Sequence, residues 1–289
     1  MKEHFINLLA NEGSGHVRLH NRIFKQLSSN IKNKNNSTNV QQVAFAYSYL
    51  TAISFLYKYA HFVDIGNEMY IQNSDIKELL GYNRITKTID KVIKKGGILD
   101  SIGLTATTKD YPIRYEVSTE EKINGISIRE FVTVSQLEVN DINYEAIKRI
   151  VKNRNYEVKE PLFLTTRFPD SEYGTLYNVA NTHDITLNEF MTFITDPDLN
   201  NIDFLLYGYF KSKCKGYPEN MKSMAMYKIC LELGIANTTF VSHLEVLKKK
   251  KYINVYHNNW KPKEDTYIEM EANKYFWKGI KETQFKVVI

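Results

Sequence analysis

The feature that most limits how this chain can fold is a spacing of apolar residues that occurs twice, 155 positions apart. The first copy consists of Ile85, Ile89, Val92 and Ile98, and the second of Phe240, Leu244, Leu247 and Ile253. Steps of three and four residues place side chains on one face of an α-helix. A lysine pair also occurs at the same point in both copies, as Lys94-Lys95 and Lys249-Lys250. The repeat predicts two modules of one kind.

The first copy lies within residues 69–117, which contain a helix–turn–helix pattern followed by two strand patterns. Gly81 ends a short helix, and a second helix is predicted from about Arg84 to Lys95, where Gly96-Gly97 stops it. Residues 98–106 and 113–117 are rich in β-forming residues and flank a polar turn. This order is typical of a winged helix-turn-helix, so we expect residues 41–117 to form one such module.

The predicted second helix carries a basic polar face opposite its apolar stripe. Such a face can pair with phosphates and reach base edges in the major groove of DNA. The candidate DNA-binding residues here are Asn83, Arg84, Thr86, Lys87, Lys91 and Lys94, and the wing adds Lys109 and Arg114. The alternative is an ordinary amphipathic helix with a solvated basic face. Asp90 lies on the same face and counts against DNA contact there.

The second copy belongs to residues 201–289, where helices are predicted at 202–213, from 223 to about 233, and at 237–250. Strands at 252–256 and 266–270 would form its wing, and Tyr275, Phe276 and Trp277 would lie in a short helix. Its candidate DNA-binding residues are Thr238, Thr239, Ser242, Lys249, Lys261 and Lys263. The front of its last helix lacks Arg and Lys, so this copy suits phosphate contacts better than base reading. Dimerisation or docking of another protein is the alternative.

Residues 40–63 are expected to be the buried aromatic first helix of the first module, although its aromatic side chains could instead form a homodimer interface. The remaining chain divides into two parts. Residues 1–40 are expected to be a polar leader and linker. Residues 118–200 are expected to be a mixed α/β connector with a hairpin at 120–135 and helices at 141–154 and 186–195. The predicted fold is therefore α+β and mainly helical, with two winged helix-turn-helix modules joined by this connector.

Charge is distributed unevenly along the 289 residues. Residues 118–200 contain 14 acidic and 8 basic residues, a net charge of −6. Because the whole chain has a net charge of +5, the parts on either side together have a net charge of +11. Positive charge thus coincides with the two predicted modules, as expected where a protein contacts a polyanion.

Several function classes lack their sequence signatures. No phosphate-binding GxxxxGK[ST] loop is present, and no tyrosine lies in a sequence setting that would activate it as a nucleophile. His16 and His20 have no third ligand at a suitable spacing, so we expect no metal, no cofactor and no enzymatic activity. No apolar run approaches the roughly 20 residues of a membrane span. The absence of a signal peptide and the presence of two cysteines favour a cytoplasmic protein.

Residues 17–117 resemble the N-terminal domain of theta-type plasmid replication initiators of low-GC Gram-positive bacteria. The matching features are the segment 23–27, Met69-Tyr70-Ile71, Leu79-Leu80-Gly81, Thr86 and Thr88, Gly96-Gly97-Ile98-Leu99, and the strand 112–117. The resemblance covers about a third of the chain. It implies binding to double-stranded DNA at a replication origin and recruitment of host replication proteins, with Arg84, Thr86 and Lys87 on a recognition helix. Two alternatives stay open: a transcriptional regulator on the same scaffold, and a winged-helix adaptor that binds proteins in replication or partition.

Overall fold

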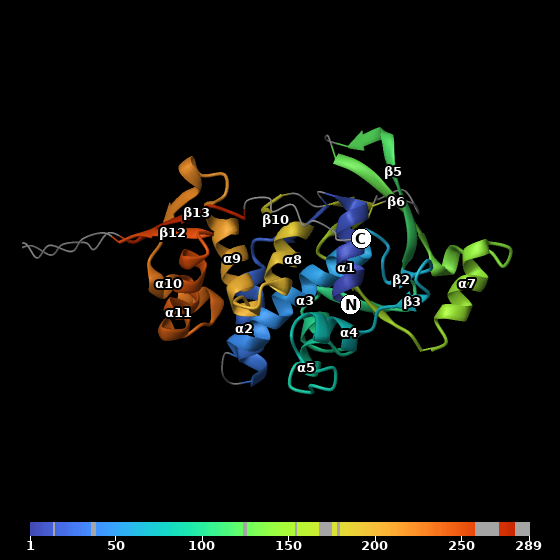
Figure 1. The fold of residues 1–289 in the computed structure, drawn as a ribbon, viewed down its shortest axis with the longest axis horizontal. Helices are drawn as coiled ribbons and strands as arrows, with labels where there is room; N and C mark the ends of the chain where they lie inside the picture. The colour runs from blue at the N-terminus through green and yellow to red at the C-terminus, as the bar shows by residue number, and fades with distance from the viewer. Residues whose placement is uncertain are drawn as a thin grey trace, which may run out of the picture. The chain divides into compact units, whose positions relative to one another are not determined.

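The structure, a computed structural model, describes residues 1–13, 15–35, 39–123, 126–153, 155–167, 175–177, 180–257 and 272–280. The chain forms two compact units (Figure 1). The first unit consists of Met1–His20 and Ser48–Leu187, and the second of Asn21–Tyr47 and Asn188–Ile289. Each unit therefore joins two separate stretches, whereas the sequence patterns predict consecutive segments. One boundary falls within helix α3 (Val40–Lys58).

The first unit combines short helices with small antiparallel sheets. Besides the end of α3, its helices are α1 (Lys2–Glu12), α4 (Asn73–Leu79), α5 (Asp90–Ile93), α6 (Ile98–Ser101), α7 (Ile142–Ile150) and the 3-10 helix η1 (Val134–Gln136). Its strands are β1 (His16–His20), β2 (Val63–Asp64), β3 (Met69–Tyr70), β4 (Thr105–Thr108), β5 (Pro112–Ile123), β6 (Ile126–Thr133), β7 (Val158–Pro161), β8 (Thr165–Arg167), β9 (Thr175–Tyr177) and β10 (Thr182–Thr186). The sheets are β1-β10, β2-β3, β4-β7 and β5-β6-β9-β8. This organisation confirms the α+β class.

The helix predicted from about Arg84 to Lys95 is shorter in the structure, which corrects the sequence analysis: only Asp90–Ile93 is helical. The Lys77 ammonium binds the carbonyl oxygens of Arg84 and Thr86, at 3.4 and 3.0 Å. The Asn83 side chain accepts the amide N–H of Ile85 at 3.0 Å. These side chains hold the backbone of the expected first turn in a non-helical loop. Ile85 was expected to point inward, yet it is 80% exposed.

The two strand patterns of this region also form different structures from the predicted wing. Residues 98–106 contain α6 and then the start of β4, which pairs with β7, while residues 113–117 belong to β5, which pairs with β6. Contacts of Asp100 explain why β4 pairs with β7. Its carboxylate accepts hydrogen bonds from the hydroxyls of Thr105 and Thr107 on β4 and from the Lys159 ammonium on β7. This network joins β4 to β7 rather than to β5.

Helices and strands also form within residues 2–35 and 118–200. Residues 2–35, assigned to a leader and linker, contain α1, β1 and helix α2 (Ile23–Asn35), and Phe24 and Leu27 are fully buried. The hairpin β5–β6 confirms the one expected around residue 125 (Figure 1). Helix α7 begins after Asp141 as expected, because the Asp141 carboxylate caps it by accepting the amide N–H of Asn143, but it ends at Ile150 rather than at residue 154. Helix α8 (Leu187–Thr195) is likewise confirmed.

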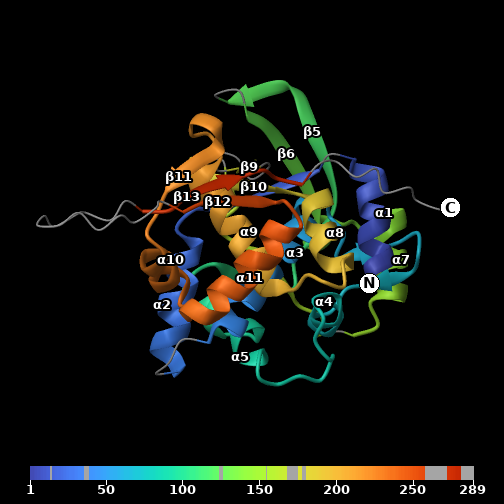
Figure 2. The same cartoon turned by 60° about the vertical axis from the view of Figure 1, so that its left-hand side comes forward.

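The second unit places helices against one three-stranded sheet. After α2, the start of α3 and α8, its elements are α9 (Asn201–Cys214), η2 (Pro218–Asn220), β11 (Met221–Ser223), α10 (Met226–Leu233), α11 (Asn237–Lys249), β12 (Ile253–Tyr256) and β13 (Lys274–Trp277). The antiparallel sheet has the order β11-β13-β12 and lies against α9 and α11 (Figure 2). The predicted helices at 202–213 and 237–250 are confirmed within one residue at each end.

Two expectations for this unit change. Tyr275, Phe276 and Trp277 lie in β13 rather than in a short helix, because β13 pairs with both β11 and β12 and completes the sheet. The second helix begins at Met226 rather than near Ser223, which belongs to β11. The predicted wing strand 266–270 lies outside the described residues.

Aromatic side chains fill the core of the second unit. Phe204 on α9 contacts Tyr47 and Phe190, and Phe210 stacks on Tyr275 at 5.0 Å between ring centroids. Gly208 permits this packing, because a Cβ atom there would overlap the Tyr47 ring, with Cζ at 2.6 Å. Helix α3 is buried along nearly its whole length, which confirms the predicted buried helix. Among the described residues, no helix is both long and apolar enough to cross a membrane.

Candidate nucleic-acid interface

The exposed face of α11 is the best-defined candidate surface in the second unit. The buried side of this helix consists of Phe240, Leu244 and Leu247, all inferred from the sequence to point inward. The opposite side carries Thr238, Ser242 and Lys249, which are exposed, with Thr239 half-buried. The structure therefore brings four of the predicted site residues together on one continuous helix. Val241, 44% exposed, lies among them.

A buried carboxylate helps to fix the orientation of α11. Asp203 on α9 is fully buried and accepts the amide N–H of Asn200, which caps that helix in return. Its other oxygen lies 2.7 Å from Nδ1 of His243 on α11. A hydrogen bond between two packed helices restricts rotation of one against the other. The exposed face of α11 is thus held in one orientation before any ligand binds.

The lysines at the C-terminal end of α11 differ in whether they form ion pairs. Lys248 pairs with Glu245 at 2.6 Å, and Lys250 binds Asp196 and Asp198 at 2.6 and 2.9 Å. These hydrogen bonds raise the pKa of Lys250. Lys249 and Lys251 are exposed, and within the part of the chain that the structure describes no ion pair involves either one. Lys261 and Lys263 of the predicted wing lie outside the described residues.

The candidate residues of the first unit lie on a loop and a short helix. Arg84 forms ion pairs with Asp75 at 2.6 Å and Glu78 at 3.0 Å, and its hydrogen bond to Glu78 raises its pKa. Its guanidinium is thus occupied by carboxylates of α4. Asn83 is exposed but binds the backbone of its own loop, and Thr86 is half-buried.

The three candidate lysines of the predicted second helix are exposed: Lys87 on the loop, Lys91 in α5 and Lys94 just after it. The two predicted wing residues are engaged elsewhere. Lys109 lies in the turn after β4, 3.4 Å from the Asn155 side-chain oxygen, and Arg114 in β5 pairs with Asp141 at 3.2 Å. The first region therefore presents separate cations rather than a helix face.

Sequence reasoning missed two kinds of residue. It did not identify Asp75 and Glu78 as partners of Arg84, although both precede it by fewer than ten positions. It also overlooked Tyr227 and Leu231 on α10, which are 62% and 77% exposed. The available signal was their position outside the helical stripe that contains Ile229 and Leu233.

Comparisons of the chain with protein-family models, with curated proteins and with solved structures find no match. Within the described residues, no group of three or more His, Cys, Asp or Glu side chains is placed to hold a metal ion. Inferences about function therefore rest on the geometry of the two regions.

Proposed function

We propose that this chain binds double-stranded DNA in a sequence-specific manner, with α11 as the recognition helix of a winged helix in the second unit. The observation that carries the proposal is the element order α9, β11, α10, α11, β12, β13 with β13 between the other two strands. A helix–turn–helix followed by a strand pair, with its last helix exposed, is an arrangement that places that helix in the major groove.

The chemistry of the exposed α11 face supports the same proposal. Thr238 and Ser242 offer hydroxyl groups that donate to and accept from base edges. Lys249 and Lys251 supply charge for phosphates, which fixes register without reading sequence. Lys87, Lys91 and Lys94 of the first unit would add phosphate contacts of the same kind.

A gel-shift and anisotropy titration with duplexes from the chain's own locus tests this function. Ser242→Glu places a negative charge on the exposed α11 face and should weaken binding at least about tenfold, or ~1.4 kcal/mol. Val139→Glu adds the same charge at a site 75% exposed in the first unit and should leave affinity within about twofold. No complex at low salt with any of these duplexes would refute DNA binding.

The biological role that we propose is replication initiation at the origin of a plasmid or phage. The resemblance of residues 17–117 to plasmid initiators supports this role, and a transcriptional regulator on the same scaffold is the competing one. Footprinting on the flanking DNA separates them: an initiator should protect direct repeats, and a regulator a promoter palindrome. Loss of replicon maintenance on substitution of Ser242 by Glu would support initiation.

A protein-binding adaptor is the second candidate, and one observation favours it. Val241, 44% exposed, presents an apolar side chain at the edge of the α11 face, where an interface with another protein would bury it. Val241→Ser should weaken assembly with a protein partner, whereas affinity for DNA should change little. Sedimentation of the full chain with replication or partition proteins, and separately with DNA, measures both quantities.

A further inference from the structure

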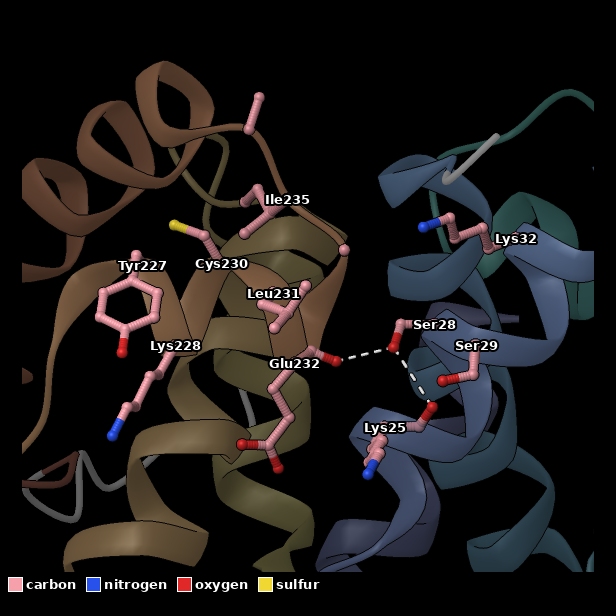
Figure 3. A pocket seen from close by; sticks show the side chains of 12 residues that line it. Lys25, Ser28, Ser29, Lys32, Tyr227, Lys228, Cys230, Leu231, Glu232 and Ile235 are labelled. Carbon is pink, nitrogen blue, oxygen red and sulfur yellow. Dashed lines mark hydrogen bonds between the residues drawn. The ribbon is translucent and has the colours of Figure 1, made fainter. Parts of the chain in front are cut away.

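A groove between α2 and α10 in the second unit is separate from the exposed α11 face (Figure 3). Its volume is about 1010 Å³. One wall comes from α2, with Lys25, Ser28 and Lys32, and the other from α10 and the turn before α11. None of Thr238, Ser242 and Lys249 lines it. The groove can therefore be occupied by a ligand that leaves the proposed recognition face untouched.

The α10 wall of the groove presents large apolar side chains that are exposed. Helix α10 buries Ile229 and Leu233 in the core, yet it leaves Leu231 77% exposed and Tyr227 62% exposed. Ile235 and Cys230 are buried beside them and extend the apolar lining. Large exposed side chains next to a hollow are characteristic of surfaces that bind an apolar group of a partner.

The charged side chains that line the groove give it a net positive charge. Lys25, Lys32 and Lys228 are exposed, and within the described residues no ion pair involves them. Glu232 is the acidic residue of the lining, but its carboxylate accepts hydrogen bonds from Lys213 at 2.8 Å and from the Tyr209 hydroxyl at 2.9 Å. Its charge is thus compensated from within the unit, and the three lysines leave the groove positive.

Internal contacts fix the width of the groove. The hydroxyl of Ser28, a buried residue, donates to the carbonyl oxygen of Glu232 at 2.7 Å and joins α2 directly to α10. Phe24, one turn earlier on α2, contacts Tyr209 on α9, with ring centroids 5.3 Å apart, and so holds α2 in place from a second side. A groove with fixed walls binds a ligand with little ordering cost.

We infer that this groove binds an acidic segment of a partner protein. A large apolar side chain of the segment contacts Leu231 and Tyr227, and its carboxylates pair with Lys25, Lys32 and Lys228. Complementary charge selects the partner and the apolar contact retains it. A nucleic acid would satisfy the lysines but would leave Leu231 and Tyr227 against a charged backbone, so an acidic peptide fits the lining better.

Peptide selection on the full-length chain tests this inference. A random peptide library displayed on phage is selected against the protein, and the enriched peptides are synthesised and titrated by fluorescence anisotropy. The expected peptides combine Asp or Glu with at least one large apolar residue, and they bind more weakly as salt rises. Leu231→Ser and Lys228→Glu should each weaken binding about tenfold.

Matched controls lie in the first unit. Val139→Ser removes an apolar side chain that is 75% exposed, and Lys152→Glu reverses an exposed lysine, so both should leave peptide affinity within about twofold. Enriched peptides without acidic residues, or peptides that bind Leu231→Ser and Lys228→Glu as well as wild type, would overturn the inference. It would also be overturned if no peptide is enriched while Lys25→Glu and Lys228→Glu weaken binding to a random duplex. Because Leu231 and Lys228 are exposed, unchanged thermal unfolding will show that each variant is folded.

Discussion

Residues 69–117 and 201–277 contain the same spacing of apolar residues but differ in the contacts of their polar side chains. In the second region the polar residues of α11 face outward, and an uninterrupted helix of 13 residues forms above Phe240, Leu244 and Leu247. In the first region, Lys77 and Asn83 bind backbone groups of the loop, and α5 is four residues long. Ile89, Val92 and Ile98 are buried although only a short helix forms, but Ile85, in the loop that these polar groups hold, is 80% exposed. Local polar groups thus determine whether the helix is continuous and whether the first residue of the apolar spacing is buried.

The largest expected effect on stability concerns the buried ion pair between Lys159 and Asp100. Lys159→Met leaves Asp100 without its ammonium partner, because Lys159 is 2% exposed and lies 2.6 Å from that carboxylate. Loss of one partner of a buried pair should lower the free energy of unfolding by about 3 kcal/mol. Urea denaturation measures it. Lys95→Met, which removes an exposed partner of Glu157, should cost less than about 1 kcal/mol; equal losses would contradict the assigned role of Lys159.

The next effect concerns the core of the second region. Gly208→Ala places a methyl group against the Tyr47 ring inside packed aromatic side chains. Overpacking of this kind should cost about 2 kcal/mol, read from the shift in thermal unfolding. Gly103→Ala is a poor control because its φ is positive, so Ser223→Ala at an exposed site of β11 serves instead and should change stability by less than about 0.5 kcal/mol. A stable Gly208→Ala variant would mean that α9 and α3 can separate without cost.

Acid should weaken the first region through Asp100. Burial opposes ionisation of this carboxyl, but hydrogen bonds from Lys159, Thr105 and Thr107 outweigh it and lower its pKa. The contribution of Asp100 is therefore complete above the unfolded pKa near 4 and is lost as pH falls through the lower folded value. Asp100→Asn should be less stable than wild type at pH 7, and the difference should shrink below about pH 4. A constant difference over that range would exclude this origin of acid sensitivity.

The smallest effect distinguishes two cations of the first region. Lys87→Ala should weaken DNA binding about threefold and reduce the salt slope by about one unit, because its ammonium is exposed. Arg84→Ala should change affinity by less than about twofold, because Asp75 and Glu78 already bind its guanidinium. Lys94→Ala should resemble Lys87→Ala. If Arg84→Ala has the larger effect, the guanidinium must leave Asp75 and Glu78 when DNA binds. The loop that contains Arg84 would then contact the DNA bases.

Sequence reasoning succeeded where the determinants were local. The limits of α11, the end of α10 near residue 233 and the start of α7 near residue 141 all depend on residues within a few positions. It failed where the partner is distant in the chain. The pairing of β4 with β7 depends on Lys159, and the strand character of Tyr275–Trp277 depends on β11 and β12. Local propensity cannot encode such pairings, and for the same reason the groove between α2 and α10 had no sequence signature.

The way in which α3 contributes to both compact units has a practical consequence for dissecting the molecule. The chain passes from one unit to the other three times, at residues 20–21, 47–48 and 187–188. A C-terminal fragment beginning at residue 188 would contain every strand of the β11-β13-β12 sheet but would lack Phe24 and Tyr47, leaving Tyr209 and Phe204 uncovered. Such a fragment should aggregate rather than report on α11. Mapping by truncation is thus unsuited to this chain, and point substitutions in the intact protein are the appropriate tool.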